Sequence, residues 1–599
     1  MREILESVAL DKLSTVIAAV RKLDTLQSSH LPSVSIQLLG NISLRGIDPF
    51  LKYHLYASGI KPMLTFGGFD TIRQDLFSLE GSDDKEGTDL TVLALDLESF
   101  DPRSRLPNWS ERDTWEELLG LFEFAARKVQ GLIVVNTFPL PCSKEAGFSS
   151  SVLTDDATAK TRDLNQKIIT FVKKHDSQFQ LVDWEYFARI LGEEKSFDYR
   201  YNYLYHAPFA NPFLNLFGLE LTKLARAIKG RTKKCLVLDC DNTLWGGVVG
   251  EDGIDGIHLD PNDYPGKAYY DFQISLLHLF DRGIMIALCS KNNEAEVMDV
   301  LECHPHCLIS KTHLVGKKIN WLDKVTNLTE LADDLNLSLE HLVFVDDNPF
   351  ECEMVRTLLP DVTVLQVPEH LYEFPNLLYQ QGLFDSISVS EEDRERTRMY
   401  HLEAKRENLY EASAGLSQYF ESLEMVAEIG PATEGQISRI AQLTQKTNQF
   451  NFTTHRYLET DIKGFLNSPI HAVFTLSAHD RFGSLGLVGV IIAKNEARSI
   501  RVDTFLMSCR ALGRGLEYIF LKKVIGDLQK SWDTCGLLKA QFVPTKKNIH
   551  LENFWPSLGL ARRGQSEDIV DYSCDLSEIQ IEDVDFIKTV ADSTSKCNS

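Results

Sequence analysis

The sequence predicts an α/β protein that is built from three α/β domains. Apolar segments rich in β-branched residues alternate with longer segments of helical spacing, which is typical of sheets covered by helices. The chain has 599 residues, enough for about three or four domains of ordinary size. Its composition, 43% hydrophobic and 25% charged, is that of an ordinary globular protein with full apolar cores.

The first domain is expected over residues 1–229. Three short apolar runs at 33–42, 90–97 and 131–138 predict strands, since each is β-branched and bounded by turn residues. The segment 114–130 places apolar residues at helical spacing between two of them. This alternation predicts a parallel sheet with helical crossovers.

A second domain is expected over residues 230–390. An apolar strand at 233–243 runs directly into acidic residues, and a helix over 269–283 leads to a second strand at 284–293. A further strand at 341–349 also ends in acids. The charged segment 391–422 follows and predicts a helical linker with a solvated face.

A third domain is expected over residues 423–583. Three apolar runs predict strands, and a helix is predicted to follow them. The strands lie at 471–479, 486–494 and 499–508, and the helix starts from Gly513. Residues 584–599 are small and polar, which predicts a disordered tail.

Net charge and cysteine usage narrow the range of partners. The formal net charge of −24 repels phosphate backbones and anionic lipid, so we expect neither a nucleic-acid nor a membrane partner. The eleven cysteines form no CxxC pair, which indicates reduced thiols rather than a zinc ribbon or a disulfide scaffold. The acidic N-terminal residues do not fit a signal peptide. A cytoplasmic location is therefore expected.

The strongest chemical signal is a set of polar residues at the ends of apolar strands. Asp239 and Asp241 follow the strand at 233–238. Two acids at this spacing can hold a divalent cation, and one can attack phosphorus while the other handles the leaving-group proton. Loops at the carboxyl edge of a parallel sheet form the usual ligand site. The same edge is expected to receive Ser290, the cation Lys324 and the acid pair Asp346 and Asp347.

This ordered set, with DxDxT at 239–243, resembles the haloacid dehalogenase (HAD) superfamily of phosphotransferases. The resemblance implies that Asp239 is a nucleophile that forms an aspartyl-phosphate and that Asp241 is the general acid/base. It implies Mg²⁺ held by Asp239, the backbone carbonyl of Asp241 and one acid of the 346–347 pair, with the choice between those two acids left open. Ser290 would bind the phosphoryl oxygens, and Lys324 would stabilise the nucleophile and the phosphate.

Longer segments at 239–253, 319–324 and 344–351 are similar to the FkbH-like branch of this superfamily, subfamily IIIC. That resemblance implies transfer of a glyceryl unit from 1,3-bisphosphoglycerate, or a related phosphorylated small molecule, to an acyl carrier protein in polyketide biosynthesis, with loss of phosphate. Two alternatives stay open. One is a free-standing Mg²⁺-dependent phosphatase of a small phosphomonoester, and the other is an adaptor that binds a carrier protein.

The same resemblance implies the type of each flanking domain. The first would be a degenerate SGNH-hydrolase-like domain with a flavodoxin-type layer, the second the HAD core with a Rossmann-like sheet, and the third a GNAT-like acyltransferase domain with a mixed sheet. Asn41 and Ile42 stand where such a hydrolase carries Asp-Ser, so the first domain is expected to be non-catalytic. Asn136, Asp198 and His206 are weak echoes of the remaining hydrolase blocks.

In the third domain, a glycine-containing turn before the predicted helix resembles an acetyltransferase pyrophosphate loop. A helix N-terminus approached by glycines attracts phosphate, which suits coenzyme A or the phosphopantetheine arm of a carrier protein. The residues of this RxxGxG turn are Arg510, Gly513, Arg514 and Gly515. Covalent loading also requires a thiol that displaces phosphate from the acyl phosphate. Cys240 and Cys509 are the two candidates, and the sequence leaves the choice open.

Overall fold

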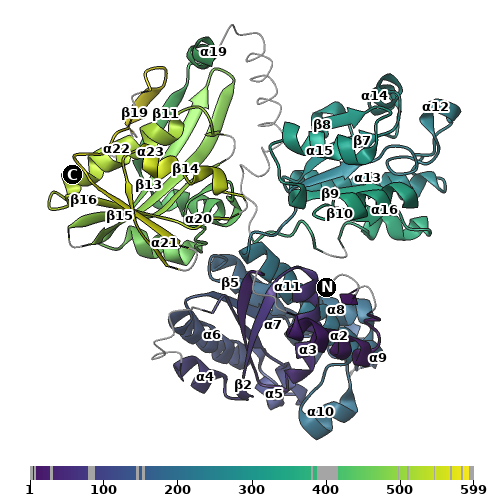
Figure 1. Ribbon diagram of the computed structural model, residues 1–599. Helices are drawn as coiled ribbons and strands as arrows, with labels where there is room; N and C mark the ends of the chain where they lie inside the picture. Colours follow the sequence, from purple (N-terminus) through teal and green to yellow (C-terminus); the bar gives the residue numbers. More distant parts are fainter. Residues whose placement is uncertain are drawn as a thin grey trace. The chain divides into compact units, whose positions relative to one another are not determined.

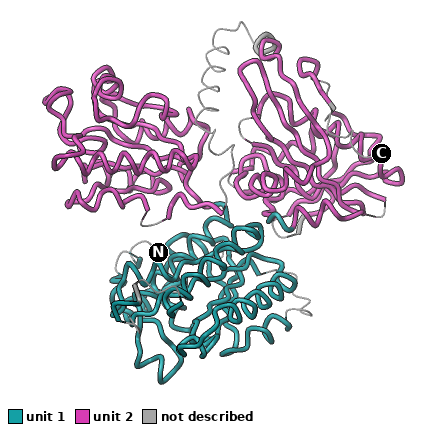
Figure 2. The backbone as a smooth tube through the Cα atoms, turned by 180° about the vertical axis from the view of Figure 1, so that it is seen from behind, with its two compact units in different colours: residues 1–230, 458–460 teal, residues 231–457, 461–599 magenta. Residues whose placement is uncertain are grey.

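The protein is described by a computed structural model of the chain. The described residues are 4–5, 8–26, 31–78, 88–143, 147–151, 155–379, 382–387, 416–496, 498–508, 511–545, 547–566, 569–581 and 584–591. They divide into two compact units, of which the first comprises residues 1–230 with 458–460 and the second comprises the remainder (Figure 2). Three separate sheets lie in these units, so the fold is α/β throughout, as the sequence predicts.

The first unit contains a five-stranded parallel sheet in the order β2-β1-β3-β4-β5, with helices on both faces (Figure 1). This is the order of flavodoxin-type sheets, as expected. The strands are β1 (Ser33–Gly40), β2 (Lys61–Phe69), β3 (Leu90–Ala94), β4 (Leu132–Asn136) and β5 (Phe179–Val182). The helices are α2 (Leu13–Thr25), α3 (Asp48–Ala57), α4 (Ile72–Ser78), α5 (Leu97–Phe100), α6 (Glu111–Lys128), α7 (Ala157–Lys174), α8 (Trp184–Leu191), α9 (Glu193–Ser196), α10 (Tyr199–Tyr205) and α11 (Asn211–Ile228).

A second parallel sheet, in the order β10-β9-β6-β7-β8, begins the second unit. The central strand β6 (Cys235–Leu238) is buried on both faces, because Leu236 and Leu238 pack into one apolar core and Val237 into the opposite one. The other strands are β7 (Met285–Ser290), β8 (Leu314–Ile319), β9 (Leu342–Asp346) and β10 (Thr363–Gln366). The helices are α12 (Val249–Asp252), α13 (Gly266–Asp281), α14 (Glu294–Cys303), α15 (Lys324–Asp334) and α16 (Pro349–Leu358).

The third sheet is mixed and runs in the order β17-β18-β16-β15-β14-β13-β11-β19, with β12 also paired to β15. Antiparallel pairs dominate, but β15 and β16 are parallel, as are β11 and β19. The strands are β11 (Val426–Pro431), β12 (Phe450–Asn451), β13 (His471–Asp480), β14 (Gly483–Glu496), β15 (Ser499–Met507), β16 (Leu537–Phe542), β17 (Ala561–Ser566), β18 (Ile569–Asp575) and β19 (Lys588–Ala591). The helices are α19 (Leu416–Leu423), α20 (Ile437–Lys446), α21 (Glu459–Leu466), α22 (Leu516–Ser531) and α23 (Phe554–Ser557).

The expectation of a disordered tail from residue 584 is wrong for its first part. Residues 588–591 form β19, which pairs in parallel with β11. The reason is local hydrophobicity, because Val584, Phe586 and Ile587 pack against the apolar core of this sheet. Most of the expected linker, residues 391–415, lies outside the described residues, while its last part falls in helix α19. Among the described helices, none is long and apolar enough to cross a membrane.

Candidate active site

The loop after β6 places two carboxylates at the carboxyl edge of the second sheet. Asp239 still belongs to the ladder, because its N–H donates to the carbonyl of Val345 on β9 at 3.0 Å. The chain then turns sharply at Asn242, whose φ of +53° is left-handed. The Asn242 side chain supports the turn by accepting a hydrogen bond from the N–H of Gly247 at 2.9 Å. Asp241 lies two residues after Asp239, directly before this turn.

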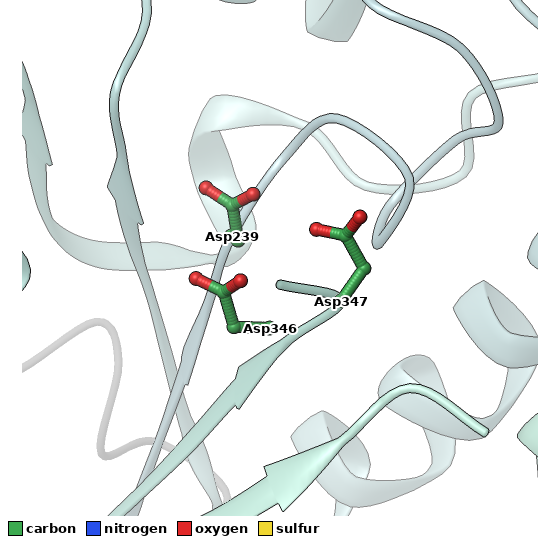
Figure 3. Close-up of side chains that lie close together, drawn as sticks. All are labelled: Asp239, Asp346 and Asp347. Carbon is green, nitrogen blue, oxygen red and sulfur yellow. The ribbon is translucent and has the colours of Figure 1, made fainter. Parts of the chain in front are cut away.

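Asp239, Asp346 and Asp347 form a cluster with the properties of a cation site. Their carboxylate oxygens lie within 4.8 Å of one another, because β6 and β9 are neighbours and both end at this edge (Figure 3). Burial, followed by the charge of Asp239, raises the pKa of Asp346 and of Asp347 to about 6. Carboxylate oxygens with room for water are the donors that Mg²⁺ prefers, so this donor set fits the ion.

Lys324 is the cation that the cluster already contains. Its Nζ lies 2.5 Å from Asp239 Oδ1 and 3.2 Å from Asp346 Oδ2, and it donates to the carbonyl of Cys289 at 2.7 Å. The side chain is almost fully buried. Burial lowers the pKa of Lys324, but the attraction of the two carboxylates outweighs burial and raises it, so the ammonium stays charged. The sequence places Lys324 here because it opens α15 directly after β8 and its loop.

Asp241 has surroundings that differ from those of the cluster, and its carboxylate is not among the clustered oxygens of the described residues. Its Oδ1 accepts from the indole N–H of Trp245 at 2.9 Å and from the N–H of Val249 at 3.1 Å. Its Oδ2 accepts from the amide of Asn292 at 2.8 Å. Burial raises the pKa of Asp241 despite these donors, and the charge of Asp239 adds to the rise. A carboxyl group held in this way can carry a proton to a leaving oxygen.

Several supporting residues are absent from the sequence-based set. Trp245 and Asn292 hold Asp241, and Lys291 pairs with the buried Glu351 at 2.6 Å. Asn292 lies two residues after Ser290, so the polar run that follows β7 is a sequence signal for this part of the site. The contact between Trp245 and Asp241 follows from the tight turn at 242 and has no separate sequence signal.

Ser290 and Cys240 lie at the same edge but are buried. Ser290 ends β7 next to β6, and its hydroxyl forms a hydrogen bond with the Cys240 thiol. Cys240 packs in the apolar core, as strand alternation predicts. Burial raises the pKa of the Cys240 thiol well above its usual range, and the charge of Asp239 raises it further. This thiol is therefore protonated and poorly suited to nucleophilic attack.

The expected phosphate loop of the third domain is described only in part. Cys509 and Arg510 lie outside the described residues. Gly513 and Gly515 have left-handed φ values of +72° and +79° directly before α22, as a glycine turn requires. Arg514 is only 7% exposed, so little of its surface is available to a phosphate on a partner protein.

The edge of β15 beyond Val502 is already occupied by the protein's own chain. β15 pairs with β16 only as far as Val502 and Ala540. Past that point Phe452 lies between them, because its N–H donates to the carbonyl of Phe505 and its carbonyl accepts from the N–H of Val543. A long acyl arm therefore cannot add to this edge as an extra strand.

In the first unit, the residues that the sequence aligned with hydrolase motifs are buried or support the backbone. Asn41 and Ile42 are buried. Asn136 bonds the backbone of Leu95 through its side-chain oxygen and nitrogen. Asp198 caps α10, and His206 adopts a left-handed φ at the end of that helix. The arrangement has no serine in the nucleophile position.

Comparisons with known proteins agree with the geometry of the second sheet. Residues 234–363 match the family model described as NLI interacting factor-like phosphatase. This stretch contains the whole carboxylate cluster and Lys324. It is a phosphatase-type domain. No curated protein gave a significant match to the chain.

Among solved structures, the chain is similar to the N-terminal part of a Bacteroides fragilis protein that contains a phosphatase domain complexed with Mg. The identity is 24%, the TM-score is 0.57, and the match covers 62% of this chain and 98% of that one. The fold of the matched region is therefore shared.

Two acetyltransferase structures also match. They are the ribosomal-protein-S18-alanine N-acetyltransferase of Escherichia coli (12% identity, TM-score 0.20, covering 25% of this chain and 94% of that one) and a GNAT-family acetyltransferase of Streptococcus pneumoniae (13%, 0.21, 25% and 98%).

Proposed function

We propose that this protein is a Mg²⁺-dependent, HAD-type phosphatase with an associated acyl-transfer activity. The observation that carries the proposal is the contrast between two carboxylates on one loop. Asp239 lies in the cation cluster and contacts Lys324, which suits an ionised nucleophile. Asp241 is held apart from the cluster with a raised pKa, which suits a proton donor. Carboxyl groups whose surroundings differ in this way divide into nucleophile and acid.

In the proposed reaction, Asp239 Oδ attacks phosphorus while the bond to the leaving oxygen breaks, and Asp241 gives its proton to that oxygen. Water then attacks the aspartyl-phosphate, Asp241 takes a proton from the water, and inorganic phosphate leaves. Lys324 neutralises charge on the phosphoryl oxygens, and Ser290 hydrogen-bonds one of them. Asp239, Asp346 and Asp347 would hold Mg²⁺, which supplies further charge neutralisation at the phosphoryl group.

The proposed substrate is a phosphorylated glyceryl unit. The support is the FkbH-like signature at 239–253, 319–324 and 344–351, which extends well beyond DxDxT. A thiolate would displace the 1-phosphate of the acyl phosphate as inorganic phosphate, and the HAD-type site would hydrolyse the 3-phosphate. The glyceryl group would then be carried as a thioester on the phosphopantetheine arm of an acyl carrier protein in polyketide assembly. The mixed sheet of the third domain supplies the acyl-transfer part. Since the Cys240 thiol is buried and protonated, Cys509 is the better candidate of the two for a covalent acyl carrier.

One experiment tests the function as a whole. The full chain is incubated with Mg²⁺, 1,3-bisphosphoglycerate and a carrier protein that bears its phosphopantetheine arm, and the intact mass of the carrier is measured. A mass increase of one glyceryl unit, without phosphate, supports the proposal. Phosphate release from a generic phosphomonoester without any change in carrier mass would favour a free-standing phosphatase. Carrier binding with neither reaction would favour an adaptor.

A further inference from the structure

The third domain contains a histidine, a tyrosine and an aspartate in mutual contact. Tyr457 donates its hydroxyl proton to Asp503 Oδ2 at 2.6 Å, and the same hydroxyl oxygen lies 3.2 Å from His455 Nδ1. His455 Nδ1 is itself 3.7 Å from Asp503 Oδ2. The side chain of His455 is 43% exposed, whereas that of Asp503 is 26% exposed. The imidazole of His455 is therefore accessible to solvent, and the carboxylate that lies beside it is more buried.

The contacts fix which ring nitrogen carries the proton. Burial raises the pKa of Tyr457, and Asp503 raises it further, so the hydroxyl stays protonated. Burial also favours a higher pKa for Asp503, but the hydrogen bonds from His455 and Tyr457 outweigh it and lower that pKa. A tyrosine has one proton, and the short contact assigns it to the carboxylate. The tyrosine oxygen can then only accept, so His455 bears its proton on Nδ1 and Nε2 keeps its lone pair.

The backbone around the cluster is irregular at both of its ends. Thr454, directly before His455, has a φ of +55°, which is a rare conformation for a β-branched residue. Asp503 is an extra residue in β15, because Thr504 pairs with Ile492 and Val502 pairs with Ala493. Such bulges re-aim side chains and are enriched beside active sites, and left-handed strain is likewise concentrated at functional sites.

Neighbouring contacts hold both irregularities in place. The N–H of Thr454 donates to Asn451 Oδ1 at 2.9 Å, and Thr453 Oγ1 donates to the carbonyl of Asp503 at 2.9 Å. Thr504 Oγ1 donates to Asp503 Oδ2 at 3.0 Å. The guanidinium of Arg456 donates to the carbonyls of Thr444 and Gln445 at the end of α20. His455 is therefore displayed from a segment that is anchored on both sides.

We propose that His455 is a general base for acyl transfer between thiols, with Tyr457 and Asp503 as its positioning residues. The inference rests on the acyl-transfer part of the proposed function. Nε2 takes the proton of an acceptor thiol as its sulfur bonds to the acyl carbon of a thioester. The C–S bond of the thioester then breaks, and the departing thiolate recovers the proton from Nε2. Asp503 stabilises the imidazolium between these two steps.

The test measures transfer from a glyceryl N-acetylcysteamine thioester to a carrier protein with a free phosphopantetheine thiol, by intact mass and with the full chain. A general base contributes roughly 100-fold or more, so His455→Gln should reduce the transfer rate by that factor. Phosphate release from a generic phosphomonoester should be unchanged. The matched control is His479→Gln, since His479 on β13 is also about half exposed and lies 4.0 Å from an acid, Glu428. The control should transfer at the wild-type rate.

A second measurement separates positioning from folding. Histidine ¹⁵N chemical shifts, assigned by loss of the His455 signals in His455→Gln, should show a proton on Nδ1 in the wild type. Tyr457→Phe and Asp503→Asn should each leave the fold intact but give a mixture of the two tautomers. Two other titrating groups lie near the cluster in the described part of the chain. The charge of Asp461 on α21 raises the pKa of Tyr457, and the charge of Asp503 acts to raise the pKa of His471 on β13.

Two results would overturn the inference, namely wild-type transfer by His455→Gln or an Nε2-protonated imidazole in the wild type. A wild-type chain that releases phosphate but transfers no acyl group would refute the proposed acyl-transfer function, and the base with it. Loss of transfer in His455→Gln alone, with phosphatase intact, supports both.

Discussion

Lys324 Nζ lies 2.5 Å from Asp239 Oδ1, inside a cluster of three carboxylates. The contact joins a helix start to a strand end across the sheet edge, and it places a permanent positive charge beside the proposed nucleophile. Burial, followed by the charge of Asp239, raises the pKa of the neighbouring Asp346 and Asp347. The catalytic predictions below follow from this arrangement.

Lys324→Met is expected to reduce phosphate release by about 100-fold or more, since one charge-stabilising donor is typically worth that much. The measurement is kcat on a generic phosphomonoester at saturating Mg²⁺. The control is Lys318→Met, because Lys318 on β8 pairs with Glu330 and Asp334 rather than with the cluster. If both variants lose activity equally, the loss does not arise from the contact with Asp239.

Asp239→Asn should reduce turnover to a few per cent of the wild-type rate or less, because it removes both the attacking charge and a cation ligand. Asp241→Asn should also be severely impaired, but here the first step leaves a covalent product that cannot be hydrolysed efficiently. Intact-mass analysis should therefore detect phosphate on the Asp241→Asn protein and none on Asp239→Asn. More than about a tenth of wild-type activity in Asp239→Asn would reject this residue as the nucleophile.

Mg²⁺ binding should weaken as pH falls through about 6. The pKa values of Asp346 and Asp347 are both raised to about 6 without metal, so below that pH the ion must displace protons. Isothermal titration at pH 7.5 and at pH 5 should show at least a tenfold loss of affinity. Equal affinities for Mg²⁺ at the two pH values would contradict the prediction that the ion competes with protons at Asp346 and Asp347.

Asp346 and Asp347 also make the stability of the metal-free protein depend on pH. Whereas Mg²⁺ binding weakens as pH falls, the stability of the metal-free protein decreases as pH rises. Their folded pKa exceeds the ordinary aspartate value of 3.8, so the folded state binds more protons than the unfolded state between about pH 4 and 6. Their contribution to the free energy of unfolding is thus greatest below pH 4 and is lost as pH rises through 6. Mg²⁺ should restore stability above pH 6, and chelation should remove it.

The first unit should show no serine-hydrolase activity. Asn41 exchanges two hydrogen bonds of 2.9 Å with the backbone of Asp96, which fixes the loop after β1 through an amide. A fluorophosphonate probe should fail to label Ser43, the exposed serine beside it. Asn41→Ala should lower the free energy of unfolding by about 1–3 kcal/mol, because two half-buried backbone groups of Asp96 lose their partners. Labelling of Ser43, or esterase activity of the chain, would show the expectation to be wrong.

The sequence was informative where chemistry and periodicity coincide. Apolar strands that end in acids predicted that the strands of the second sheet are parallel. They also predicted that Asp239 and Asp346 lie at the same edge of that sheet. The support of Asp241 by Trp245 and Asn292 was not predictable in this way, because it depends on how two loops fold over one another. Likewise, β12 is only two residues long, and a segment of that length is too short to show the alternation of apolar and polar residues that predicts a strand.

The position of β19 was missed for a different reason. Polar residues dominate the end of the chain, and the three apolar residues before β19 are too few to stand out by composition. Their contacts are with a sheet whose other strands come from much earlier in the sequence, so local pattern contains no information about the partner. The same limit applies to the pairing of Tyr457 with Asp503, which joins a loop to a bulge in a distant strand.

The pairing of β19 with β11 joins the last described strand of the third domain to its first (Figure 1). A ribosome completes β11 long before β19 exists, so a nascent chain carries β11 with one edge open until residues 588–591 have been made. Open strand edges are templates for association with other chains, and domains generally fold in the order in which they are made. Expression of shortened chains that stop before residue 584 should therefore yield aggregates, even though the phosphatase-type domain would already have folded.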